Sequence, residues 1–548
     1  MSNIPQLSVR SVPLVFSPNL PDLFRCISRS SLVWKHGDSF LLGFGTAARC
    51  EIVIPATHTD DVDCTDDVHD INENFCPDDA VYTDDAVCSD AISSDRDAAA
   101  MTDGNIADAA DTHVSSNSET GKQKNFSCHT PHRFHVAKDW WNQLRMNAEI
   151  DDSVQRPGSG LIAFGSFSFN AQSPAGSALI VPQLLLAADQ ENVWLTQICP
   201  VGAEMPQIPV TQEALQKLIF MISGKNTPAG NVSEQPKKCS SAEAYETNPS
   251  ISHQTGHRQA VFTSLPEPEK WMQSVADATE LIRRGELEKV VLSRCIKVQL
   301  PHLVSSAALL KELARAYPST WVFSIDGLIG ASPEMLAESD LAQSDPHRIH
   351  CRVLAGTKPF NTAHGLTDST LDAAQSAQIQ DFALETSAKN IHEHHIAADS
   401  AATTLNEFGT VEMSEPYVLD LPNVQHLATD LFTNIEHGYS LLDVIGKLHP
   451  TAALGGSPRR RALQTIARLE DTDRERYGAP VGWIASGTAG EFGQWAIALR
   501  CCEIAPNLRT VKAWAGSGIM AESVPSEELA ETSAKFAPIM DALKSQCC

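Results

Sequence analysis

The sequence has no long apolar run and no excess of positive charge. No apolar stretch reaches the roughly 20 residues that a membrane-spanning helix needs. Lys and Arg number 41 against 68 Asp and Glu, so the formal net charge is −27. A surface with this charge repels phosphate groups, so we expect no nucleic acid and no anionic membrane as a partner.

The sequence also lacks the pattern of a signal peptide and the pattern of a cysteine framework. The first thirty residues lack a basic start followed by a long apolar core, so we expect no signal peptide. The 14 cysteines are scattered, with no Cys-x-x-Cys pair. Such spacing is typical of reduced thiols, and it predicts a cytoplasmic location.

The acidic charge is concentrated in one segment. Residues 57–120 contain 16 Asp and 2 Glu but one Arg, with few large apolar side chains. Such a segment buries too little surface to offset the entropy of ordering. Its Asp spacing does not fit a calcium loop, which needs Gly at the sixth and Glu at the twelfth position. We predict an acidic, disordered insertion at 57–130 and a polar linker or loop at 223–258.

The remaining chain alternates between strand and helix patterns. A hairpin is predicted for residues 32–34 and 40–45, across Gly37 and Asp38. Further strands are expected at 161–169, 178–182, 184–186, 193–196, 289–294, 321–325, 328–334, 350–357, 424–436, 480–486, 494–504 and 510–519. Helices are expected around 140–144, at 271–282, 305–316, 370–398, 440–448 and 458–469, and from Pro525 onward. Neighbouring strands joined by short turns predict an α+β fold with large, mostly antiparallel sheets. Residues 1–56 and 131–222 would form the N-terminal parts of the sheet core.

The stretch from Trp514 to Lys535 combines several polar signals. We predict that its strand ends in a small-residue turn at 515–518, whose N–H groups could hold an anion. On the helix that follows, Glu528, Glu531 and Lys535 fall on one stripe, because residues three and four apart share a face. They form either an exposed salt bridge or carboxylates for Mg²⁺ beside a lysine.

Three further charged residues have two possible roles each. Lys289 opens an apolar strand, where it either reaches water or, if buried, serves as a general base. Glu334, in GASPEML, is either a surface carboxylate or an acid whose pKa is raised by apolar neighbours. Arg500, after the strand 495–499, is either an edge charge or a group that grips a carboxylate through two hydrogen bonds.

Three histidines lie close together in the helix predicted at 370–398. His392, His394 and His395 contain no pair four residues apart, so they do not form the His-Glu-x-x-His zinc pattern. Glu393, between them, is an alternative ligand for Mg²⁺.

Ten segments in the same order resemble one family, the chorismate-utilising enzymes. The resemblance is dense from about 260 to 545 and thinner over 1–56 and 134–222. The segments are KVVLSR (289–294), GASPE (330–334), LAGT (354–357), SAKNIHEH (387–394), HLATDL (426–431), LHPTAALGGSP (448–458), PVGW (480–483), WAIALRC (495–501), AGSGI (515–519) and ETSAKF (531–536). The resemblance implies two large sheets packed together with helices outside, and a chorismate-binding catalytic region at 259–548.

The resemblance also implies residue roles. Lys289 is expected to be the general base that activates water, and Glu334 the general acid that protonates a departing hydroxyl. Glu393 and Glu531 are expected to hold Mg²⁺, with Glu528 acting through a metal-bound water. The expected substrate-binding residues are Arg500, Lys535, Gly516, Ser517, His426, Thr357, Ala355 and Gly356.

The activity implied is that of a magnesium-dependent isochorismate synthase. Water adds at C2 of chorismate while the C4 hydroxyl leaves, which requires a base and an acid on opposite sides. Lysine at 289 and alanine at 355 differ from ammonia-using relatives, so no amidotransferase subunit is expected, and the resemblance favours a monomer.

The pathway stays open at this stage, with menaquinone biosynthesis preferred because of residues 448–458. The alternatives are a salicylate synthase, a siderophore-pathway isochorismate synthase and a non-catalytic scaffold. The chain departs from the family pattern at Gln494, where Glu is usual, and at Ser517, where Ala is common.

Overall fold

The computed structural model describes residues 4–19, 22–23, 25–54, 132–223, 260–341, 344–359, 388–420, 424–488 and 490–546. The predicted insertion at 57–130 and the predicted linker at 223–258 lie outside these residues, apart from Ser223. In the described part of the chain, no helix has the length and apolarity needed to cross a bilayer.

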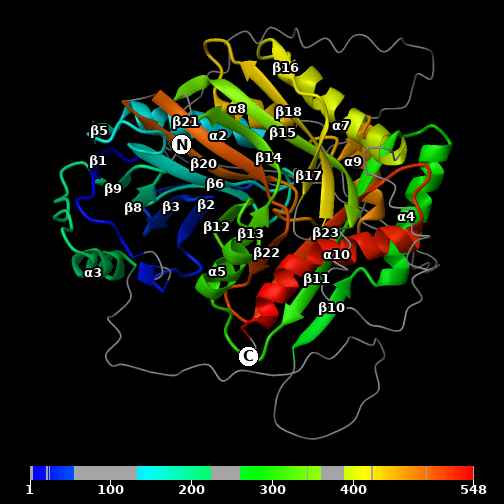
Figure 1. Cartoon of the computed structure of the whole chain (residues 1–548), viewed down its shortest axis with the longest axis horizontal. Helices are drawn as coiled ribbons and strands as arrows, with labels where there is room; N and C mark the ends of the chain where they lie inside the picture. Colours follow the sequence, from blue (N-terminus) through cyan, green and yellow to red (C-terminus); the bar gives the residue numbers. More distant parts are fainter. Residues whose placement is uncertain are drawn as a thin grey trace, which may run out of the picture. The chain divides into compact units, whose positions relative to one another are not determined.

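Two large sheets make up most of the described structure (Figure 1). The first has 13 strands, in the spatial order β10 (Val261–Leu265), β11 (Lys289–Gln299), β23 (Thr510–Ile519), β22 (Cys501–Ile504), β13 (Leu328–Ser332), β12 (Trp321–Ile325), β2 (Leu32–His36), β3 (Ser39–Phe44), β8 (Leu184–Ala188), β9 (Val193–Pro200), β1 (Leu7–Pro13) and β5 (Glu149–Asp152), with β19 (Gly456–Ser457) beside β11. The second has 10 strands, in the order β16 (Val411–Met413), β18 (Val424–Asn434), β15 (Asp345–Pro359), β14 (Met335–Asp340), β21 (Gly490–Ile497), β20 (Pro480–Gly487), β6 (Leu161–Ser166), β7 (Ser177–Val181) and β4 (Ala48–Ile52), with β17 (Tyr417–Asp420) beside β18.

The sheets are almost entirely antiparallel. Among the described strands, β1 and β5 form the only parallel pair. The hairpin of β2 and β3 turns at Gly37 and Asp38, as predicted. The first sheet takes strands from the N-terminal, middle and C-terminal parts of the sequence. The predicted α+β class with mostly antiparallel sheets is therefore confirmed.

Helices cover the sheets. They are α2 (His132–Met146), α3 (Gln212–Ile222), α4 (Pro268–Arg283), α5 (Ser306–Ala316), α7 (Ala388–Leu405), α8 (Leu441–Leu448), α9 (Arg459–Leu469) and α10 (Pro525–Lys544). In Figure 1, α10 crosses β11 and β23 of the first sheet, whereas α7 lies along β15 and β18 of the second. The predicted start of α10 at Pro525 is confirmed, and its Phe536 and Leu543 are buried in the core. The described part of the predicted helix 370–398 is α7, which continues to Leu405.

The largest apolar core joins the two sheets. Trp34 and Trp194 of the first sheet and Phe164 and Trp495 of the second belong to one cluster, and none is more than 2% exposed. Aromatic side chains of this size bury much apolar surface, which stabilises the packing of one sheet on the other.

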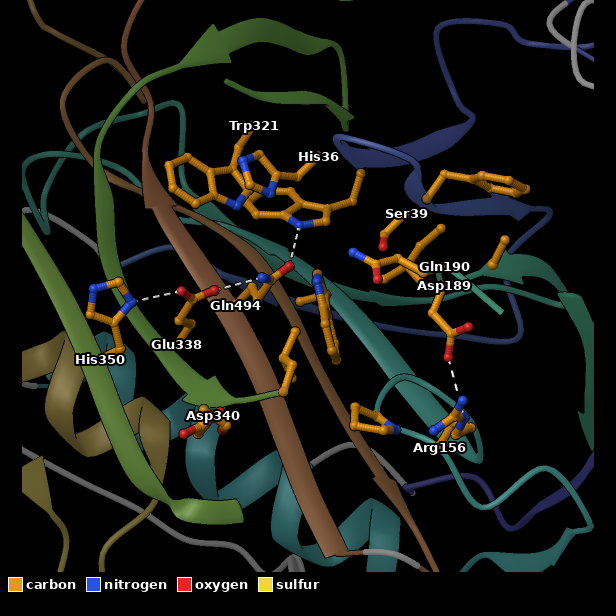
Figure 2. A pocket seen from close by; sticks show the side chains of 18 of the residues that line it. His36, Ser39, Arg156, Asp189, Gln190, Trp321, Glu338, Asp340, His350 and Gln494 are labelled. Carbon is orange, nitrogen blue, oxygen red and sulfur yellow. Dashed lines mark hydrogen bonds and ion pairs between the residues drawn. The ribbon is translucent and has the colours of Figure 1, made fainter. Parts of the chain in front are cut away.

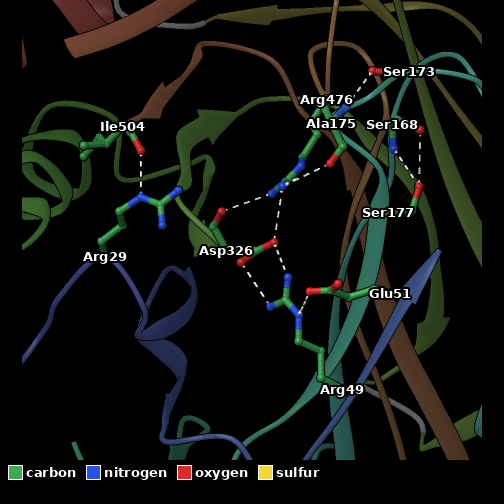
Figure 3. A network of polar contacts seen from close by, with 10 residues as sticks. All are labelled: Arg29, Arg49, Glu51, Ser168, Ser173, Ala175, Ser177, Asp326, Arg476 and Ile504. Atoms are coloured by element: carbon green, nitrogen blue, oxygen red, sulfur yellow. Dashed lines mark hydrogen bonds and ion pairs between the residues drawn. The ribbon is translucent and has the colours of Figure 1, made fainter. Parts of the chain in front are cut away.

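A polar network also ties the sheets together (Figure 3). Asp326, in the turn between β12 and β13, lies 2.9 Å from the Arg49 guanidinium on β4 and 3.2 Å from that of Arg476. Burial alone would raise the pKa of Asp326, but the hydrogen bond from Arg49 and the charge of Arg476 outweigh it and lower that pKa. The carboxylate is therefore ionised and binds both arginines.

Two predicted strands are wrong because the chain crosses from one sheet to the other within them. The single strand predicted at 494–504 is two strands in the structure: β21 belongs to the second sheet and β22 to the first. The chain crosses between them, and Arg500 has a φ of +46°. The prediction at 328–334 ends early for the same reason: β13 stops at Ser332, β14 begins at Met335, and Glu334 lies in the crossing. Pro333 and Glu334 in the first crossing and Ala498 and Leu499 in the second are buried, so the apolar pattern of the flanking strands runs on toward each crossing.

These two crossings lie side by side. The Ile497 N–H donates to the Glu334 carbonyl at 3.0 Å, and the Ser332 hydroxyl donates to the Ile497 carbonyl at 2.6 Å. The hydrogen bonds hold Glu334 and Arg500 at the same end of the two sheets.

The predicted small-residue turn at 515–518 is also wrong. These residues continue β23 and pair with β11, with Gly516 opposite Ser293 and Gly518 opposite Val291. Pairing in the sheet overrides the local preference of glycine and serine for turns. The small residues instead leave room for the side chains that approach β23.

Candidate active site

A cavity lies where the two crossings meet. Its lining comes from both sheets and two helices, and includes Glu334, Glu393, His426, Arg500, Glu531 and Lys535. These residues are far apart in sequence, and the structure brings them together around one space of about 60 Å³.

Lys289 lies behind this lining. It opens β11 and is fully buried, so the alternative in which it reaches water is wrong. Its Nζ is 2.9 Å from Oε1 of Glu393, which α7 carries. Gly518 makes room for this ion pair, because a Cβ at that position would overlap Glu393 Oε1. The pair thus links the first sheet to the helix on the second.

Glu334 is held as a neutral acid. Its side chain is 4% exposed, and it forms no ion pair with the described residues. Burial raises the pKa of Glu334 to about 8, although the positive charges of Lys289 and Arg500 oppose this shift. At neutral pH the carboxyl group therefore keeps a proton that it can donate.

The carboxylates of α10 are held by lysine and serine. Glu531 Oε1 accepts a hydrogen bond from Lys535 Nζ at 2.5 Å and lies 3.0 Å from the Ser517 hydroxyl. The Ser517 hydroxyl also donates to Glu528, and the Ser523 hydroxyl donates to Glu528 at 2.6 Å. Glu528 is 2% exposed and does not line the cavity. It is linked to Glu531 through Ser517.

Arg500 and Lys535 bring positive charge to the cavity. The Arg500 Nη2 lies 3.5 Å from Nε2 of His426. Burial, followed by the charges of Arg500 and Lys535, lowers the pKa of His426 well below its ordinary value. The imidazole is therefore neutral, so Arg500 and Lys535 are the source of the positive charge in this part of the lining.

The strand edge of β23 offers further donors. Its pairing with β22 ends at Ala513, so beyond that residue the described strand is paired on one edge. Lys535 Nζ donates to the Gly516 carbonyl at 3.0 Å, which shows that this carbonyl points to the open edge. The N–H and C=O of one strand residue point the same way, so the Gly516 N–H also faces that edge. A backbone donor thus exists here without the turn that the sequence predicted.

The wall from β15 depends on a glycine. Gly356 has a φ of +75°, and a Cβ there would lie 2.9 Å from the Asn390 carbonyl of α7. The helix can approach this closely because Gly356 has no side chain. Ala355 and Gly356 line the cavity. The Thr357 side chain lies outside the described residues, although its backbone pairs with His426.

Sequence reasoning missed three residues at the site. Tyr477 is buried and lines the cavity. Arg474, 3% exposed, pairs with Glu470 at 2.6 Å and donates to the Leu454 and Val291 carbonyls, which belong to the lining. Tyr477, Arg474 and Glu470 contact the rest of the site only in the folded chain, and no motif in the sequence indicated them.

The donor set fits Mg²⁺ but not zinc. Among the described residues, no cluster of three or more His, Cys, Asp or Glu side chains could hold a metal. Mg²⁺ needs fewer protein ligands, because it binds one or two carboxylates and completes its shell with water and substrate oxygens. Glu393 and Glu531 supply two such carboxylates at one cavity. His392 and His395 are exposed while His394 is buried, so the three do not converge.

A larger cavity of about 680 Å³ lies elsewhere between the sheets (Figure 2). Figure 2 shows Glu338 between His350 and Gln494, and the two hydrogen bonds measure 2.8 and 2.6 Å. Gln494, where the family usually has Glu, also accepts a 2.9 Å hydrogen bond from the Trp34 indole. None of the predicted site residues lines this cavity.

The sequence matches a known family over most of its length. The family described as "Chorismate binding enzyme" matches residues 111–544, which include every residue of the small cavity. The chain belongs to this family of chorismate binding enzymes. Isochorismate synthase DhbC of Bacillus subtilis is 32% identical over 304 residues, covering 53% of the chain and 71% of DhbC. Isochorismate synthase MenF of the same organism is 27% identical over 430 residues, covering 75% and 81%.

A solved structure has the same fold as this chorismate binding enzyme. It is MenF, the menaquinone-specific isochorismate synthase from Escherichia coli, with a TM-score of 0.61 and 20% identity. The likeness covers 98% of this chain and 95% of that one. The expected arrangement of two packed sheets with helices outside is therefore confirmed.

Proposed function

We propose that this chorismate binding enzyme is a magnesium-dependent isochorismate synthase. The observation that carries the proposal is that a buried lysine, Lys289, and a protonated carboxyl group, Glu334, both lie at one cavity. Its relatives named isochorismate synthase support the same activity. Water is a poor nucleophile and hydroxide a poor leaving group, so the reaction needs both groups.

Glu334 is the proposed acid. Its proton passes to the C4 hydroxyl of chorismate, which then leaves as water. Lys289 is the proposed base and takes a proton from the water that bonds to C2. One proton is gained by Lys289 and one lost by Glu334 in each turnover, so the pair returns to its starting state when a proton moves back through solvent.

Glu393 contacts the proposed base and is also a proposed metal ligand. Its Oε1 lies 2.9 Å from Nζ of Lys289. Glu393 and Glu531 would hold Mg²⁺, and the ion when bound would neutralise and orient a substrate carboxylate. Only Oε1 of Glu393 makes this contact, so the second carboxylate oxygen can hold the ion while Glu393 stays beside Lys289.

The substrate's carboxylates have clear partners in this proposal. Arg500 can bind one through two parallel hydrogen bonds, and Lys535 and the Gly516 N–H can bind another. Lys535 already contacts both Glu531 and the Gly516 carbonyl, so it lies between the proposed metal ligand and the open strand edge.

The remaining parts of the proposal concern context. The product would feed menaquinone biosynthesis, which the relative named MenF supports. Because water and not ammonia is the nucleophile, no amidotransferase subunit is needed, and the enzyme would work as a monomer in the cytoplasm. The described cysteines carry free thiols, which is compatible with a reducing compartment.

The test is incubation of purified protein with chorismate and Mg²⁺, followed by chromatography. We expect isochorismate as the main product and no turnover after chelation. Salicylate as the main product would replace the proposal with a salicylate synthase. A folded protein that leaves chorismate unchanged would contradict it and favour a non-catalytic scaffold.

A further inference from the structure

The middle one of the three α7 histidines is turned into the protein. His394 is 1% exposed, whereas His392 and His395 are exposed to solvent. Its Nδ1 lies 3.2 Å from the Ala355 carbonyl on β15, and its Nε2 lies 2.7 Å from the Thr429 hydroxyl on β18. A carbonyl can only accept, so Nδ1 carries the hydrogen and Nε2 accepts from the threonine hydroxyl.

This imidazole joins three walls of the cavity. The residue before it is Glu393, the ion-pair partner of Lys289. Ala355 and its neighbour Gly356 belong to the lining, and Thr429 lies on the same strand as His426. α7 approaches so closely that Gly356 has no room for a side chain. A change in the depth or rotation of α7 would therefore move the Glu393 carboxylate relative to Lys289.

We propose that His394 is a positioning residue that sets the direction of Glu393. The inference rests on the proposed function, because Glu393, the residue that His394 would position, is a proposed ligand of Mg²⁺. His394 touches neither substrate nor metal. It offers one donor and one acceptor on opposite sides of a rigid ring, which ties α7 to two neighbouring strands at once. A flexible side chain would leave the helix freer to shift.

The test measures Mg²⁺ affinity by calorimetry, together with thermal unfolding in the absence of Mg²⁺. His394→Leu removes both hydrogen bonds, and we expect the dissociation constant for Mg²⁺ to rise about 10- to 100-fold. His394→Asn keeps a donor for the Ala355 carbonyl, and we expect an intermediate value. The matched control is His395→Leu, on the exposed side of the same helix, which should bind Mg²⁺ as the wild type does.

A second variant covers the case in which His394→Leu does not fold. Thr429→Val conserves shape but removes the hydroxyl that donates to Nε2, and we expect a three- to tenfold weaker Mg²⁺ affinity, on the order of a modest outer-shell effect. Folded His394→Leu or Thr429→Val protein that binds Mg²⁺ within twofold of the wild type would overturn the inference while leaving the proposed function intact. Wild-type protein that makes isochorismate without binding Mg²⁺ would overturn both the inference and the metal part of the proposal.

Discussion

Two clusters of charged groups, one half-buried and one buried, lie along the same strands and differ in whether their members have partners. β14, β15 and β21 run between them. At one end, His350, Glu338, Asp430 and Gln494 form a closed set in which each group has its partner at 2.6–2.8 Å. At the other end lies the small cavity of the candidate active site, where Glu334 forms no ion pair with the described residues.

The difference appears in the titration of the two groups. Burial alone would lower the pKa of His350, but hydrogen bonds to Asp430 and Glu338 outweigh it and raise that pKa to about 9. Burial raises the pKa of Glu334 to about 8 with far less compensation. The first cluster stabilises the charge that His350 carries, whereas the second keeps Glu334 from acquiring one. We infer that the first cluster stabilises the fold and the second is arranged to transfer a proton.

The largest expected effect comes from removing the base. Lys289→Ala should lower kcat by about 10⁴-fold, the upper range for general base catalysis, because the proposed base is lost. Chorismate should still bind, since Arg500 and Lys535 remain, and the measurement is steady-state kinetics with a separate binding assay. Lys297→Ala, at an exposed position of the same strand, is the matched control. Near-normal turnover by Lys289→Ala would remove Lys289 from this role.

Removing the acid should have the next largest effect. Glu334→Gln keeps the shape but cannot donate a proton as an acid, and kcat should fall by about 10³-fold. In the wild type, turnover should decline as pH rises through about 8, because Glu334 then loses its proton. A pH–rate profile checks this, and an unchanged rate from pH 7 to 9.5 would contradict it.

The same variant should change how stability depends on pH. Between about pH 4.5 and 8 the folded state binds the Glu334 proton and the unfolded state does not, so this group's contribution to stability is lost as pH rises through about 8. Glu334→Gln should lack this decline. Urea unfolding of both proteins at pH 5 and pH 8 gives the comparison, and parallel losses of stability in the two proteins would refute the buried neutral acid.

A smaller effect is expected from crowding the ion pair. Gly518→Ala places a Cβ against Glu393 Oε1, whose flexible carboxylate can move aside. The fold should lose little stability, while turnover should fall about 10- to 100-fold because the carboxylate is displaced. Kinetics and thermal unfolding together separate the two effects. A variant with full activity would show that the Lys289–Glu393 contact is unimportant.

The smallest effect on activity is expected in the other cluster. His350→Leu leaves Glu338 and Asp430 without their shared partner and should lower the free energy of unfolding by about 2 kcal/mol at pH 6. The loss should shrink as pH rises through about 9, because wild-type His350 then gives up its charge. Turnover per folded molecule should stay within about twofold. A large loss of kcat would mean that the two clusters act together.

Part of the candidate site was accessible from the sequence, whereas the cluster around His350 depended on tertiary pairing. The ten family segments led to Lys289 and Glu334, and apolar periodicity identified helices such as α10. The crossing at Arg500 was missed because the run from Trp495 to Leu499 is buried on both sides and contains no turn residue. The turn expected at 515–518 was wrong because pairing with β11 decides the conformation of those glycines. The position of His394 depended on which face of α7 meets β15, and three histidines within four residues did not by themselves indicate it.

The most direct test of the central claim is an infrared titration of the Glu334 carboxyl group, with Glu334→Gln as the reference. The account predicts a protonated carboxyl at neutral pH that loses its proton near pH 8. A carboxyl that titrates near pH 4.5, as an exposed glutamate does, would contradict the assignment of Glu334 as the acid opposite Lys289.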